Sequence, residues 1–149
     1  MKEVSDLPVQ KGTVMEYRLE TRIEQEGQKE IFVYEGQGQM VQMGEWLYLR
    51  YVEAETSNKV TIKVSRAGKM TIMRRQGDVL LSRLSFDSEK SGSAQIPTEA
   101  GLMEIETKTN QMVQNYKEQP FSGYVEVAYT IGIGEESLGS YEMSLQFTT

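Results

Sequence analysis

Alternation with a period of two residues runs through nearly the whole chain, and it constrains the fold more than any other feature. Between Val14 and Ile23 every second residue is charged, and the residues between them are mostly apolar. Successive side chains of a β-strand point to opposite faces, so this pattern is typical of an antiparallel strand with one buried face. One face would carry Glu16, Arg18, Glu20 and Arg22, and the other Met15, Tyr17, Leu19, Thr21 and Ile23.

The same alternation predicts about ten strands joined mostly by tight turns, of which Gly77-Asp78 is a hairpin signal. The polar stretch 87–99 is predicted to be the longest loop. A helix competes only within 98–116, where Gly101 and Thr107 disfavour it, and we predict two strands there. The predicted strands are 13–25, 29–41, 46–54, 60–64, 70–75, 79–86, 102–109, 111–116, 121–133 and 138–147.

A chain of 149 residues is long enough for one ordinary core, so residues 1–149 are predicted to form a single domain with a loose lead-in at 1–12. An open sheet of so many strands would expose its edges. We therefore expect an all-β fold, a single antiparallel meander closed into a barrel of about 8–10 strands. Gly36 and Gly38 share one face of the second strand and predict a bend there.

The composition excludes several classes of chemistry. The chain contains neither Cys nor His, which excludes thiolate ligands, imidazole ligands and Ser-His-Asp catalysis. We expect no metal, no cofactor and no catalytic residues, which argues against an enzyme. The net charge of −6 argues against nucleic-acid binding. The sequence shows no secretory signal and no membrane segment, which predicts a cytoplasmic protein that does not bind membranes.

Four strand patterns, taken in order, carry a family resemblance. They are Val60–Ser65 followed by Met73-Arg74; Tyr48–Tyr51 with Glu53; Gly101 with Met103, Ile105 and Thr107; and Gly123 with Val125, Val127, Ala128 and Tyr129, ending at 134–136. Across residues 13–147 the chain resembles the YwiB-like family of uncharacterised bacterial proteins. The resemblance implies a calycin-type barrel, similar in shape to lipocalins, and implies no activity. The hairpin around Gly77 is longer than the family pattern, which leaves the alignment of Arg83 open.

Positive charge is concentrated in one part of the chain. Residues 59–83, the basic segment, contain seven Lys and Arg and one acid, a balance of +6, against −12 for the rest. Such a segment could bind an anionic ligand or an acidic partner. Alternatively, Glu53 and Glu55 on the preceding strand could pair with Lys59 or Lys63 across the sheet.

Two arginines of this segment are candidate ligand anchors. A two-residue turn at Gly77-Asp78 would place Arg74 and Arg83 on the same face, among apolar residues, with Arg75 on the other. A buried arginine needs a negative partner, because an unpaired buried charge is costly. The partner could be the carboxylate or phosphate of a ligand, or an internal Glu that closes one end of the barrel.

Residues 31–34 and 46–49 are apolar or aromatic on both faces. Either they form an oligomer or ligand surface, or the N-terminal segment or the long loop covers one face. We therefore predict a non-catalytic binder of a small amphipathic or anionic ligand, with Arg74, Arg83, Arg75, Trp46 and Tyr48 as candidate binding residues. The alternative is a protein-interaction module that uses the basic segment or the two-sided apolar strands. The sequence leaves the oligomeric state open.

Overall fold

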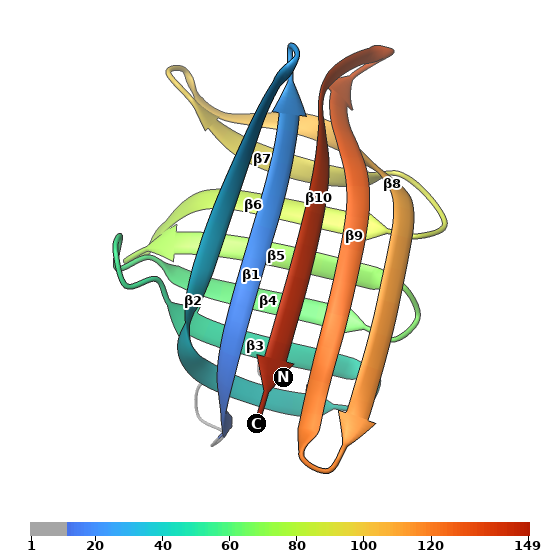
Figure 1. Ribbon diagram of the computed structural model, residues 1–149. Helices are drawn as coiled ribbons and strands as arrows, with labels where there is room; N and C mark the ends of the chain where they lie inside the picture. Colours follow the sequence, from blue (N-terminus) through green and yellow to red (C-terminus); the bar gives the residue numbers. More distant parts are fainter. Residues whose placement is uncertain (1–11) are drawn as a thin grey trace.

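The computed structural model describes residues 12–149, and they form ten antiparallel strands closed into a barrel (Figure 1). The predicted lead-in at residues 1–12 lies outside this range except for Gly12. The strands are β1 (Thr13–Gln25), β2 (Gln28–Met43), β3 (Trp46–Val52), β4 (Lys59–Ser65), β5 (Lys69–Gln76), β6 (Val79–Asp87), β7 (Gly92–Thr98), β8 (Gly101–Glu118), β9 (Phe121–Ile133) and β10 (Glu136–Thr148). This confirms the predicted all-β meander. No helix in the described range has the length and apolar character needed to span a membrane.

The barrel wall has two halves that run in different directions (Figure 1). β2, β1, β10, β9 and β8 form the front wall, and β3 to β7 cross behind it as the back wall. The long strands β2 and β8 belong to both halves, because each pairs with a front strand and with a back strand. Pairing of β1 with β10 closes the sheet, so each of the ten strands in residues 12–149 has a neighbouring strand on both sides.

The alternation predicted from sequence decides which side chains fill the barrel. On β1, Met15, Tyr17 and Leu19 are almost fully buried, and the charged residues between them face outwards. All of the remaining strands, β2 to β10, also contribute inward residues to one continuous core. Its largest fully buried members include Phe86, Phe147, Leu49 and Ile72. The inside of the barrel is therefore packed with side chains around these residues.

The region 87–118 differs from the sequence prediction in two ways. The predicted loop contains strand β7, whose inward Ala94 and Ile96 are small or apolar enough to pack against the core. The two strands predicted at 102–109 and 111–116 are one strand, β8, with a bulge between Thr109 and Gln111. A bulge adds one unpaired residue, here Asn110, without ending the strand, and this shifted the alternation that the prediction used.

The predicted bend at Gly36 and Gly38 lies where β2 passes from the front wall to the back wall. Gly36 pairs with Tyr17 of β1, whose ring lies against it, and Gly38 pairs with both Met15 of β1 and Tyr51 of β3. A Cβ atom on Gly38 would overlap the carbonyl oxygen of Arg50. Glycine is needed here because the two walls approach each other closely.

Candidate functional site

Arg74 points into the barrel and forms an ion pair there. On β5 it follows the inward residues Met70 and Ile72, and its Nε donates to Oε2 of Glu53 at 3.3 Å. Glu53 is 4% exposed, and it also accepts hydrogen bonds from the hydroxyl of Thr56 and the amide of Asn58. The internal partner that the sequence left open is therefore a glutamate at the end of β3.

The prediction that Arg74 and Arg83 share a face is wrong. β5 and β6 pair with a register shift after Arg74, so that Arg74 lies opposite Ser82 and Arg83 lies opposite Met73. Leu81 is the extra residue of the bulge, and one extra residue reverses the face of every residue beyond it. Arg83 is consequently exposed on the outside of the barrel.

Four tyrosines surround Arg74: Tyr17, Tyr34, Tyr51 and Tyr129. We term these tyrosines, together with Glu53 and Arg74, the interior cluster. The guanidinium carbon of Arg74 lies 5.8 Å from the centre of the Tyr34 ring. Tyr17 and Tyr51 stack with their ring centres 3.8 Å apart. The ring of Tyr129 packs against the ring of Phe86, with their centres 4.4 Å apart, and so adds to the aromatic side chains inside the barrel. The cluster therefore joins apolar ring faces to polar groups inside the barrel.

The interior cluster has hydrogen-bond donors without acceptors. The hydroxyl of Tyr51 is buried and has no partner among the described residues. Nε of Arg74 donates to Glu53. Within residues 12–149, the two terminal nitrogens of Arg74 donate to no acceptor. Burial is the main cause that raises the pKa of Tyr51, so its hydroxyl stays protonated and can donate at neutral pH. Thr109, which lies opposite Tyr129, has a second buried hydroxyl without a described partner.

The raised tyrosine pKa values have a consequence at high pH. Burial is the first cause for Tyr17, Tyr51 and Tyr129, so in the folded chain each ionises above the ordinary pKa of 10.0. Above that pH the unfolded chain binds fewer protons than the folded one, and stability is lost as the pH rises. We expect Tyr129→Phe to make this loss shallower by up to about 1.4 kcal/mol per pH unit, measured by urea unfolding above pH 10. An unchanged slope would show that Tyr129 is not protected from ionisation.

The other four candidate residues lie on the outside of the back wall. Arg75 and Arg83 are exposed, and Trp46 and Tyr48 share their outward face on β3 with Nζ of Lys63, which lies 4.3 Å and 5.9 Å from the two ring centres. The structure thus separates Arg74 from the rest of the predicted set. We term this surface the basic outer face; its cations are Lys59, Lys63, Lys69, Arg75 and Arg83.

The predicted pairing of Glu53 with Lys59 or Lys63 does not form, because Glu53 turns inwards to Arg74. Within residues 12–149 no cation of the basic outer face makes an ion pair. Of the two-sided apolar strands, Tyr48 is buried, whereas Ile31 is 60% exposed and Phe32 41% exposed at the far end of β2. The positive charge of the basic outer face is therefore not neutralised by any described carboxylate.

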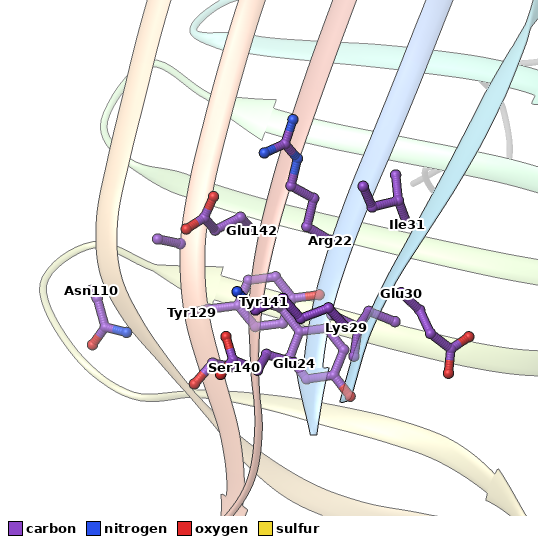
Figure 2. Close-up of a pocket in the computed structure, with 12 residues that line it drawn as sticks. Arg22, Glu24, Lys29, Glu30, Ile31, Asn110, Tyr129, Ser140, Tyr141 and Glu142 are labelled. Atoms are coloured by element: carbon purple, nitrogen blue, oxygen red, sulfur yellow. The ribbon is translucent and has the colours of Figure 1, made fainter. Parts of the chain in front are cut away.

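A shallow groove on the front wall was not predicted. It holds about 360 Å³ and crosses β2, β1, β10, β9 and β8 near the β1–β2 hairpin (Figure 2). Figure 2 shows Arg22, Lys29, Glu24, Glu30 and Glu142 around it. The small residues Ala128 and Ser140, spaced among charged residues on outward strand positions, are the sequence signal that could have revealed it. Because the groove is lined by charges of both signs, it favours no particular ligand.

The fold and the interior cluster define a single-chain antiparallel barrel that encloses an ion pair and several tyrosines beside its apolar core. Residues 18–145 match the model of a family described as a domain of unknown function, DUF1934, and the chain belongs to this family. Its structure is similar to the crystal structure of the ywiB protein from Bacillus subtilis, with a TM-score of 0.74, 21% sequence identity and 93% of each chain covered. The likeness supports the fold alone. The comparison with curated proteins gave no match.

Proposed function

We propose that the protein binds a small amphipathic anion in the interior cluster, without catalysing a reaction. The observation that carries this proposal is a set of donors without described acceptors: the buried hydroxyl of Tyr51 and the terminal nitrogens of Arg74, whose side chain is 22% exposed. A carboxylate, sulfonate or phosphate group is the natural acceptor for a guanidinium and a phenol together. Lipocalin-like barrels of similar strand number can hold one small ligand.

The surroundings of the cluster match the apolar part of such a ligand. Inward-facing apolar side chains around the Arg74 end of the barrel are only half-buried, although they pack against the core: Tyr34, Leu84, Ile96, Met103 and Tyr141. Half-buried apolar residues on an inward face leave apolar area for a ligand to cover. Glu53 completes the site by holding Arg74 in place through Nε, which leaves the other guanidinium nitrogens for the ligand.

The probe for this proposal is anilinonaphthalene sulfonate, an amphipathic anion that becomes fluorescent in apolar surroundings. Its neutral counterpart N-phenylnaphthylamine lacks the sulfonate and is the matched control ligand. We expect the sulfonate to bind about ten-fold more tightly than the neutral compound, because a hydrogen bond to a charged group contributes about 1.5–3 kcal/mol. Equal affinities would show that the barrel offers only an apolar surface.

Tyr51→Phe separates ligand binding from folding, because its two expected effects have opposite signs. Removing a buried hydroxyl without a partner is expected to stabilise the ligand-free protein by about 1 kcal/mol, measured by urea unfolding. The same change is expected to weaken the binding of anilinonaphthalene sulfonate about ten-fold and to leave N-phenylnaphthylamine unaffected. If the variant binds anilinonaphthalene sulfonate as tightly as the parent does, Tyr51 does not contribute to the binding site.

A further inference from the structure

Among the described strands, β6 and β7 share the least completely paired boundary of the barrel wall. Within the described residues only two residue pairs join these strands, Arg83 with Gln95 and Leu84 with Ala94. Every other neighbouring pair of strands is joined along most of the shorter strand. Figure 1 shows β6 and β7 separating towards the end of β7. We term this boundary, between residues 79–82 of β6 and 96–98 of β7, the seam.

The two ends of this boundary differ. At the end away from the seam, the hydroxyl of Thr107 on β8 donates to the carbonyl oxygen of Ser85 on β6, past Gly92 of β7. A side chain on Gly92 would overlap that carbonyl, so glycine permits this close approach. This hydrogen bond ties β6 to β8 at that end, whereas no hydrogen bond of this kind crosses the seam within the described residues.

The seam leaves strand edges without partners. On one side of β6, Val79, Leu80 and Ser82 pair with β5, and Leu81 is the bulge residue. On the other side, residues 79–82 pair with no described strand. On the facing edge, Pro97 has no N–H to donate, which is how natural edge strands limit unwanted pairing. An unpaired edge of this length can accept one short extended peptide through its main-chain hydrogen bonds.

Side chains around the seam determine what such a peptide must carry. Leu84, Ile96 and Met103 face the interior and are half-buried, so inward side chains of the peptide would meet apolar surface. Arg83 of β6 and Arg75 of the neighbouring β5 are exposed on the outward face and form no ion pair within residues 12–149. Because side chains of a strand alternate between faces, the matching peptide has apolar residues at one set of positions and acidic residues at the other.

We propose that the β6–β7 seam binds an extended segment of a partner protein in which acidic and apolar residues alternate. The peptide adds a strand beside residues 79–82, its apolar side chains cover Leu84 and Ile96, and its acidic side chains lie by Arg83. Charge complementarity selects an acidic partner, since the basic segment carries +6 in a chain whose remaining residues carry −12. The proposal does not depend on an interior ligand.

The test uses the whole protein and a short fluorescein-labelled peptide in which Glu and Val alternate. Fluorescence anisotropy measures its affinity, and a peptide of the same composition with Glu and Val in two separate blocks is the control. We expect the block peptide to bind about ten-fold more weakly, and a backbone N-methylated form of the alternating peptide to lose binding, because strand addition needs peptide N–H groups. Equal binding of the alternating and block peptides would reduce the seam to a general charged patch and overturn the proposal.

Two further measurements locate the peptide. Arg83→Glu is expected to weaken the alternating peptide at least five-fold, and Lys69→Glu, the same change of charge at the far end of β5, is expected to have little effect. Amide hydrogen exchange is expected to slow at residues 79–82 when the peptide binds. Equal losses in the two variants, or no slowing at 79–82, would contradict the proposal. All of these measurements are made without anilinonaphthalene sulfonate, so they stand if the interior site fails.

Discussion

Arg74→Met is expected to lower the free energy of unfolding by about 3–5 kcal/mol, the largest loss we expect from a single side chain. The substitution leaves Glu53 in the barrel, 4% exposed, without its cation. Removing one partner of a buried pair is costly because the remaining charge is neither hydrated nor neutralised. Urea unfolding of the ligand-free protein, with the slope of the transition checked for a two-state change, measures the loss.

Two matched variants show whether the loss arises from the orphaned carboxylate. Arg83→Met makes the same change of residue type on the exposed outer face, and we expect it to alter stability by less than about 0.5 kcal/mol. Adding Glu53→Gln to Arg74→Met replaces the buried charge by a neutral amide and is expected to recover much of the loss. Equal effects of Arg74→Met and Arg83→Met would contradict the internal ion pair.

Gly38→Ala is expected to cost about 3 kcal/mol, although it adds only one methyl group. The new Cβ would overlap the carbonyl oxygen of Arg50 and lie 2.9 Å from the Cβ of Tyr51. Backbone atoms cannot turn away as a flexible side chain can, so β2 and β3 would have to separate where β2 passes between the two walls. Thermal and urea unfolding both report this loss.

Gly36→Ala is the matched control for this substitution. Gly36 lies two positions earlier on the same inward face of β2, and its added Cβ would meet the ring of Tyr17, with 3.3 Å to the hydroxyl oxygen. The ring can shift by a few tenths of an ångström, so we expect a loss of about 1 kcal/mol or less. A loss as large as that of Gly38→Ala would show that the cost comes from strand conformation and not from the contact between strands.

The sequence alone predicted most of the barrel because strand alternation is a local property. Whether a residue points in or out follows from its neighbours along the chain, so the inward set Met15, Tyr17 and Leu19 could be read directly. Turn glycines are similarly local: Gly27, Gly44, Gly77 and Gly134 all have positive φ at hairpin turns. The prediction failed for β7 because its outward residues are polar, and its packing depends on Ala94 and Ile96 meeting a core formed by distant strands.

The interior cluster was only partly predictable. Arg74 was identified because a charged residue follows two apolar ones on the same face, and an internal Glu was one of its two predicted partners. Tyr17, Tyr34 and Tyr129 were not identified as neighbours of Arg74, because the pattern of a single strand does not show which residues lie across the barrel from it. Their proximity to Arg74 arises only when β1, β2 and β9 face β5 across the closed wall.

Composition and alternation by themselves determined the all-β class, the closure of the sheet, the lack of Cys and His chemistry, and the concentration of positive charge in residues 59–83. Tertiary structure decided the face of Arg83, the continuity of β8 through Asn110, and the pairing of Glu53 with Arg74. The physical reason is the same for the first two. A bulge adds a single residue, leaves no strong mark in the sequence, and reverses the face of every side chain beyond it. The ion pair depends on strand order, because β3 and β5 meet only through β4.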